Sequence, residues 1–137
     1  MEAISNRKLE LRIPAEMRYV ALVRRGVRSL AESVGFPRED VADVEVAVSE
    51  AVTNSVMHGS PDRESSAVVV KCRAVSDRMV VEVEDQSTAE SLPARWRICG
   101  PAEEKGRGFF MMHELMDECD NCRTELGFRV TMTKQRR

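Results

Sequence analysis

The sequence predicts an α+β fold, a two-layer sandwich in which about three helices cover one face of a mostly antiparallel sheet. Valine-rich segments come in pairs joined by short turns, amphipathic helical segments separate these pairs, and 42% of the 137 residues are hydrophobic. Strands that arrive as hairpins form antiparallel sheets, whereas parallel sheets need a crossover between strands. A chain of this length supports one hydrophobic core, so we expect residues 1–137 to form a single domain.

Two different hydrophobic periods predict the first strand and the first helix. Residues 8–13 alternate polar and apolar side chains and stop at Pro14, which is typical of a half-buried edge strand. From Ala15 to Val34, apolar residues recur every three or four positions, which predicts an amphipathic helix. Gly35 and Pro37 end this helix, because glycine accepts the left-handed position after a helix and proline cannot continue one.

A second helix and a hairpin are predicted in the middle of the chain. The helix runs from Pro37 to about His58, because a proline followed by acidic residues suits a first helical turn. Residues 67–75 and 79–84 are valine-rich runs around a short turn, which indicates two antiparallel strands. Residues 86–105 have no periodic pattern, and we expect a long loop there.

The C-terminal part is predicted to add a third helix and a closing hairpin. Gly106-Arg107-Gly108 precedes residues 109–116, whose apolar side chains predict the helix. Residues 123–125 and 128–134 flank Leu126-Gly127 as the two strands of the hairpin.

Composition and charge exclude several functional classes. The chain has 21 basic and 23 acidic residues and a net charge of −2, so it lacks the positive field that draws proteins to nucleic acid. Aromatic residues make up only 4%, which disfavours a base-stacking surface. No apolar run approaches the roughly 20 residues of a membrane span, and the polar N-terminus does not resemble a signal peptide. We therefore expect a cytoplasmic protein with no direct nucleic-acid partner and no membrane partner.

A polar stripe on the second predicted helix is the strongest chemical signal. Glu50, Asn54 and His58 are four residues apart, so a helix stacks them on one face between apolar flanks. The stripe is either a solvated face or the lining of a pocket, and the apolar flanks favour the pocket. In a pocket, Asn54 can offer its amide oxygen to Mg²⁺, while Glu50 orients or deprotonates a nucleophile.

Two further features suit a nucleotide, and each also has a simpler structural interpretation. Gly106, Arg107 and Gly108 stand at a predicted helix start, where free N–H groups attract anions, but the same residues suit a tight turn. Asp85 ends a buried strand, where it either caps a turn or accepts a hydrogen bond from an adenine amino group.

Together these features resemble the ATP-binding family that includes gyrase, heat-shock chaperones, histidine kinases and MutL. Within it, the chain is most similar to the small anti-sigma-factor serine kinases of bacterial stress response and sporulation. The similarity covers nearly the whole chain, and residues 47–54 are its most specific part. The segments that carry it are 14–15, 19–20, 47–54 with His58, 83–85, 106–108, 110–112, 115–118 and 130–134.

The resemblance implies the Bergerat ATP-binding fold, with ATP and Mg²⁺ as ligands, and a role for each matched residue. Glu50 would be the general base that activates an acceptor serine, and Asn54 would hold the Mg²⁺ that bridges the ATP phosphates. Asp85 would accept from the adenine amino group. The other matched residues implied to face the nucleotide are His58, Lys105, Gly106, Arg107 and Gly108.

The resemblance also implies protein partners. The acceptor would be a serine on a STAS-domain antagonist, and the unphosphorylated antagonist would compete with a sigma factor for this chain. Arg24, on the exposed side of the first predicted helix, would contact a partner, or it is an ordinary solvated arginine. Relatives are dimers, so we expect a homodimer, in which the strand at residues 8–13 could pair with its copy across a twofold axis.

Departures from the family pattern fall on the adenine side. No glycine follows Asp85 over residues 86–89, and Phe128 follows Gly127 where relatives commonly have threonine. These departures predict weaker nucleotide binding. They also leave open a partner-binding module of the same fold without kinase activity.

The cysteines suggest a third, unrelated class. Cys119 and Cys122 form a Cys-x-x-Cys, which can be half of a zinc site or a redox pair. Zinc needs four ligands, and no second pair stands at suitable spacing. The motif is expected at a helix end rather than a helix start, so we interpret these residues as free thiols.

Overall fold

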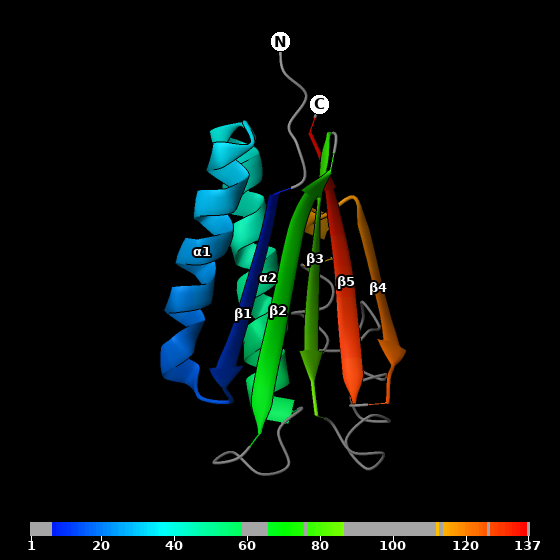
Figure 1. Ribbon diagram of the computed structural model, residues 1–137. Coiled ribbons are helices and arrows are strands. Elements are labelled where there is room, and N and C mark those ends of the chain that lie inside the picture. Colours follow the sequence, from blue (N-terminus) through cyan, green and yellow to red (C-terminus); the bar gives the residue numbers. More distant parts are fainter. Residues whose placement is uncertain are drawn as a thin grey trace.

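The computed structural model describes residues 7–58, 66–75, 77–86, 112, 114–125 and 127–136. The five strands form one antiparallel sheet in the order β1-β2-β3-β5-β4, and both α-helices lie on one face of it (Figure 1). This arrangement confirms the predicted α+β two-layer fold. The element bounds are β1 Arg7–Pro14, the 3-10 turn η1 Met17–Tyr19, α1 Val20–Ser33, α2 Arg38–His58, β2 Ala67–Val75, β3 Arg78–Asp85, β4 Glu118–Arg123 and β5 Phe128–Gln135.

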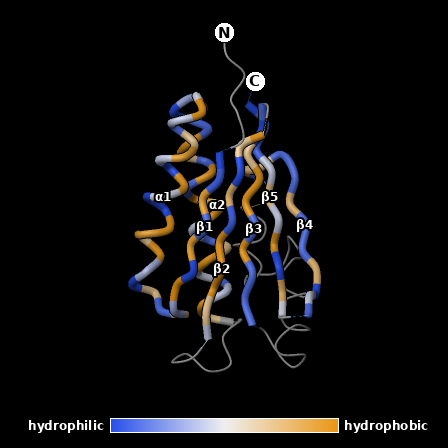
Figure 2. The backbone as a smooth tube through the Cα atoms, in the orientation of Figure 1, coloured by the Kyte–Doolittle hydropathy of each residue, from blue (hydrophilic) through white to orange (hydrophobic). Residues whose placement is uncertain are grey.

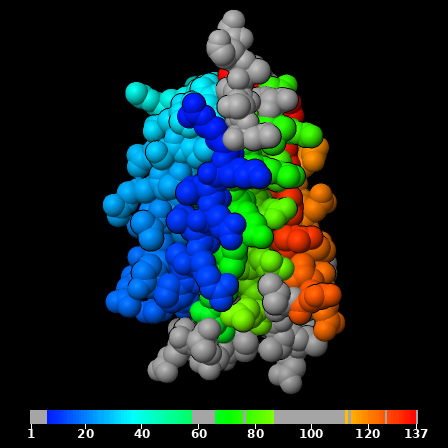
Figure 3. All heavy atoms as spheres, in the orientation of Figure 1, coloured from blue at the N-terminus to red at the C-terminus, as the bar shows by residue number. Residues whose placement is uncertain are grey.

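Alternation along the strands separates a core face from a solvent face. On β2, Val70 and Cys72 are buried toward the helices, while Lys71 and Arg73 are exposed on the other side. Figure 2 shows hydrophobic and hydrophilic residues alternating along the strands, and Figure 3 shows the solvent face of the sheet, with the blue atoms of β1 beside the green atoms of β2. Each fully buried valine contributes roughly 1.5–3 kcal/mol to stability.

The two helices cover different parts of the core face. α1 packs over β1 and β2, whereas α2 packs against α1, β2, β3 and β5. Gly26 allows the close approach of α1, because a Cβ at this position would lie 3.1 Å from Leu9 Cδ2. The buried side chains of α2 include Val44, Val48, Val52 and Val56, which recur every four residues and form its apolar face.

The predicted start of the first helix was wrong. Ala15 is buried and its N–H donates to the Ser66 carbonyl at 3.1 Å, so this residue still belongs to the sheet layer. A 3-10 turn follows, with the Tyr19 N–H donating to the Glu16 carbonyl, and α1 begins only at Val20. Met17, one of the apolar residues in the periodic pattern that predicted the helix, is 48% exposed.

The predicted bounds of the fourth strand were also wrong. β4 runs from Glu118 to Arg123 and contains the Cys-x-x-Cys, which was expected at a helix end. Its sequence has low strand propensity, and pairing with β5 overrides that preference. The second helix and the β2–β3 hairpin are confirmed, with β3 reaching one residue further at each end.

The expected loop at 86–105 and the third helix at 109–116 lie largely outside the described residues. The described part holds one helical turn, in which the Met116 N–H donates to the Met112 carbonyl at 3.0 Å. Across the described portion of the chain, no helix is both long and apolar enough to cross a membrane.

Candidate active site

α2 places Glu50 and Asn54 on one face, one turn apart, at the boundary between core and surface. Both side chains are half-buried, while Ala51 and Val52 beside them are fully buried. The stripe is therefore neither a fully solvated face nor part of the apolar core. Polar groups at such a boundary can contact a ligand from water while the helix holds them in place.

Asn54 carries a buried polar atom that the described residues leave unpaired. Its Nδ2 is inaccessible to water and finds no hydrogen-bond partner among them, and the same holds for Ser49 Oγ. Nearly all buried polar groups in proteins are hydrogen-bonded, so this unpaired N–H donor calls for an acceptor that the described residues do not supply. The amide of Asn54 and the carboxylate of Glu50 offer oxygens, the ligands that Mg²⁺ prefers. These residues therefore fit a Mg²⁺ whose remaining positions are taken by water and substrate.

Asp85 ends β3 on the face that looks toward the helices. Asp85 is 1% exposed, and it stands directly opposite Phe128 of β5, a fully buried residue. Residues opposite each other in an antiparallel pair point to the same side, so this carboxylate and this ring lie together under the helix layer. The predicted placement at the end of a buried strand is confirmed, and the role toward adenine stays a prediction.

Several predicted residues are not placed by the structure. Lys105, Gly106, Arg107 and Gly108 lie outside the described residues. His58 ends α2, but its side chain is likewise outside the described part.

Arg24 lies on the outer side of α1, as predicted, and it is paired within the chain. Its side chain is 49% exposed, and Nη2 is 3.7 Å from Glu45 Oε2 on α2. Arg28 Nε lies 3.5 Å from the other oxygen of the same carboxylate. The Glu45 side chain is 14% exposed and is shared by the two arginines, so this ion pair is partly shielded from water, and the role of Arg24 toward a partner stays a prediction.

Sequence reasoning missed Ser49 and Glu45 as parts of these two regions. Ser49 precedes Glu50 and shares the unpaired, buried character of Asn54, but a serine inside a helix gives no sequence signal of that kind. Glu45 forms ion pairs with two arginines of α1, Arg24 and Arg28. This pairing depends on how α1 packs on α2, which the sequence pattern does not specify.

The cysteines do not form a metal or redox centre in the described part of the chain. Cys119 is buried opposite Met132, whereas Cys122 is exposed opposite Arg129, so the two thiols lie on opposite faces of β4. Burial raises the pKa of the Cys72 thiol to about 12, which keeps it protonated and unreactive. The described residues contain no cluster of three or more His, Cys, Asp or Glu that could hold a metal ion. Among the described residues, Cys72, Cys119 and Cys122 form no disulfide, and the absence of a metal or redox role for the Cys-x-x-Cys stays a prediction.

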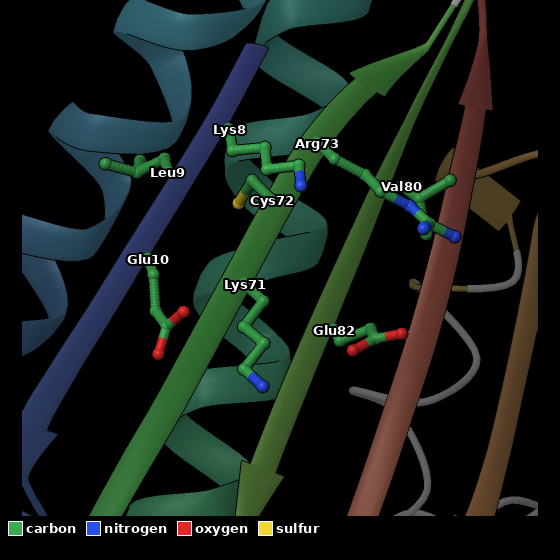
Figure 4. Close-up of a pocket in the computed structure, with 8 residues that line it drawn as sticks. All are labelled: Lys8, Leu9, Glu10, Lys71, Cys72, Arg73, Val80 and Glu82. Atoms are coloured by element: carbon green, nitrogen blue, oxygen red, sulfur yellow. The ribbon is translucent and has the colours of Figure 1, made fainter. Parts of the chain in front are cut away.

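A separate hollow of about 230 Å³ lies on the solvent face of the sheet. Figure 4 shows its charged side chains on β1, β2 and β3, with the helix layer behind the strands. None of the predicted site residues that the structure describes lines it. Its lining residues are Lys8, Leu9, Glu10, Lys71, Cys72, Arg73, Val80 and Glu82.

Comparison with known proteins agrees with the fold described above. A family model described as a histidine kinase-like ATPase domain matches residues 13–134. The serine-protein kinase RsbW of Bacillus velezensis is 34% identical over 135 residues, covering 92% of this chain and 84% of that protein. The serine-protein kinase RsbW of Listeria innocua is 35% identical over 136 residues, covering 93% of this chain and 86% of that protein.

Two solved structures share the fold. The crystal structure of the RsbU and RsbW domains of Rv1364c from Mycobacterium tuberculosis matches with a TM-score of 0.71 and 23% identity, covering 94% of this chain. This chain spans 32% of that longer one. The histidine kinase domain of a blue-light activated kinase from Erythrobacter litoralis matches with a TM-score of 0.55 and 18% identity, covering 90% of this chain and 62% of the other.

Proposed function

The chain belongs to the histidine kinase-like ATPase family and, within it, to the serine-protein kinases of the RsbW type, and we propose that it phosphorylates a STAS-domain antagonist of a sigma factor. In this proposal the chain sequesters the sigma factor in the cytoplasm. The unphosphorylated antagonist competes for the chain and frees the sigma factor, and ATP-dependent phosphorylation of a serine on the antagonist ends that competition.

The observation that carries the proposal is the half-buried face of α2 with its unpaired amide. Glu50 and Asn54 lie one turn apart, and Asn54 Nδ2 lacks a partner among the described residues. Phosphoryl transfer asks a protein mainly for positioning and charge compensation; this pair can supply positioning, and a Mg²⁺ held by its oxygens would supply the charge compensation. The departures near Asp85 leave this face unchanged.

In the proposed reaction, Glu50 accepts the proton of the acceptor serine. The serine oxygen forms a bond to the γ-phosphorus of ATP, and the bond from that phosphorus to the ADP oxygen breaks. Asn54 holds Mg²⁺ through its amide oxygen, and the ion, when bound, compensates charge on the phosphates. Asp85 accepts a hydrogen bond from the adenine amino group, which would favour ATP over GTP.

The test is transfer of labelled phosphate to a STAS-domain antagonist in the presence of Mg²⁺. Glu50→Gln should lower the transfer rate by about 100-fold or more, because general-base catalysis typically contributes 10²–10⁴-fold. Glu82→Gln is the matched control, since it makes the same chemical change on the solvent face of β3 and should transfer normally. Transfer by Glu50→Gln at the rate of the unsubstituted chain would remove Glu50 from the reaction.

A partner-binding module without kinase activity is the second candidate, and Phe128 favours it. This fully buried ring stands opposite Asp85, at a position where relatives commonly have threonine. Binding of antagonist and sigma factor by a chain that transfers no label would support the module.

Arg24 and β1 are the proposed contacts with other chains. Arg24 is half-exposed on α1, and Arg24→Glu should weaken binding to a partner with an acidic surface.

β1 is an edge strand of the sheet, which supports its pairing with a second copy. Sedimentation at micromolar concentration tests the homodimer, and a monomer would contradict it.

A further inference from the structure

Lys134 of β5 is a buried lysine that faces the helix layer. Its side chain is 9% exposed, and it stands opposite Met79, which is fully buried. A buried ammonium is costly unless it is paired. Lys134 Nζ has two such partners, Asp43 Oδ2 of α2 at 3.3 Å and the carbonyl oxygen of Leu115 at 2.6 Å.

The Leu115 contact fixes a short segment, residues 114–117, on the end of β5. The Asp117 N–H donates to the Thr133 carbonyl at 2.9 Å, and Asp117 Oδ2 accepts from the Gln135 N–H at 2.6 Å. Lys134 lies between Thr133 and Gln135 in the chain. Its ammonium donates to the carbonyl of Leu115, which lies at the end of a helical turn. Carbonyls at a helix end lack intrahelical donors, so the ammonium satisfies one of them.

The Asp43 contact acts on the helix that carries the proposed catalytic pair. Glu50 is seven residues beyond Asp43 and Asn54 is eleven beyond it. At 3.6 residues per turn these separations are close to two and three full turns, so all three side chains share one face of α2. The Asp43 contact therefore lies on the same face of α2 as Glu50 and Asn54.

Resting on the proposed function, we propose that Lys134 is a positioning residue of the kinase site. Its ammonium holds α2 against β5 and against residues 114–117, and thereby keeps Glu50 and Asn54 aligned for transfer. The residue acts through Asp43 and touches no reacting atom.

Four variants and one control test the proposal in the intact chain. Lys134→Met removes the ammonium but keeps most of the buried volume, and Asp43→Asn removes the charge at the α2 end. Lys71→Met is the control, because this lysine is exposed on the solvent face of β2, as Figure 4 shows. Each variant is assayed with labelled ATP, Mg²⁺ and a STAS-domain antagonist.

Lys134→Met should lower kcat by about 10- to 100-fold, with a smaller change in the KM for ATP, because small misplacements of catalytic groups are costly. Lys134→Arg should restore most of the loss, since a guanidinium can also donate to both partners. Asp43→Asn should lower kcat in the same direction, and the double variant should be no worse than Lys134→Met alone. A folded Lys134→Met with the kcat of the unsubstituted chain, or losses that simply add, would overturn the proposal.

Amide hydrogen exchange on the nucleotide-free protein separates this proposal from the proposed function. Lys134→Met should speed exchange at residues 47–54 and 114–117 by about 10-fold while leaving β1 and β2 unchanged. Uniform acceleration over the whole chain, or no change in α2, would overturn the positioning role. If the unsubstituted chain transfers no phosphate, the kinase proposal fails, and the exchange pattern still decides the role of Lys134.

Discussion

The α2 face and the β3–β5 strand ends, the two sides of the candidate site, are built in opposite ways. On α2, Glu50 and Asn54 are half-buried, and a buried amide nitrogen has no partner among the described residues. At the strand ends, Asp85 and Phe128 are almost completely buried. The helix side thus keeps polar groups for a ligand, whereas the strand side fills its space with an aromatic ring. Under the proposed function, this difference would separate the chemistry of transfer, on α2, from the strength and selectivity of base binding, at the strands.

The largest expected effect is on the α2 side. Asn54→Ala should lower phosphate transfer by about 100-fold or more, because the proposed Mg²⁺ ligand is lost. The free energy of unfolding should change little, since the removed amide nitrogen makes no hydrogen bond with the described residues. Labelled transfer and thermal unfolding measure the two effects, with Thr53→Ala as the control on the same helical turn. Phosphate transfer by Asn54→Ala at the rate of the unsubstituted chain would contradict the proposed role of the α2 face.

A smaller effect on nucleotide binding is expected at the strands. Phe128→Thr should tighten the dissociation constant of ATP with Mg²⁺ by about 3- to 10-fold, because the ring no longer fills the space beside Asp85 and a hydroxyl can reach the base. The same change should cost about 3–5 kcal/mol of stability, as loss of a buried aromatic ring does.

Calorimetry and thermal unfolding measure the outcome at Phe128, and Phe36→Thr is the matched control. Phe36 is buried in the core just after α1, so its substitution should lower stability without changing nucleotide affinity. An affinity that is unchanged or weaker in Phe128→Thr would show that this ring does not limit base binding.

The smallest effect concerns Cys72, a buried residue of β2. Burial raises its pKa from 9.0 to about 12 on folding, so the folded state holds the proton more tightly. This stability is fully present below about pH 9 and is lost as pH rises toward 12, at no more than about 1.4 kcal/mol per pH unit. Urea unfolding between pH 8 and 10.5 should show the decline, and Cys72→Val should flatten it. Cys122→Ser, at an exposed thiol, should leave the slope unchanged.

Local periodicity explains why much of the helix side could be predicted. Glu50 and Asn54 share a face because α2 repeats every 3.6 residues, and its apolar residues mark which face is buried. The same logic placed β1 and the β2–β3 hairpin, since alternation reports burial of one strand face. The half-buried state of Glu50 and Asn54 could not be predicted, because it depends on how much of the surface of α2 the neighbouring elements cover.

The strand side depends on pairing between distant segments. β5 lies between β3 and β4, and this order brings Phe128 opposite Asp85 and Lys134 next to Asp43, 91 residues away in the chain. β4 has no strand signal in its own sequence and forms by pairing with β5. Its register then places Cys119 and Cys122 on opposite faces, which separates the two thiols of the Cys-x-x-Cys.

By itself, the sequence determined α2, the β2–β3 hairpin and the Glu50–Asn54 face, because each follows from a repeat within neighbouring residues. Only the tertiary structure decided the extent of β4, the residue that stands opposite Asp85 in the sheet, and the contacts of Lys134. These features depend on which distant segments meet, and the free energy that selects the pairing comes from burial and hydrogen bonds that no local pattern contains.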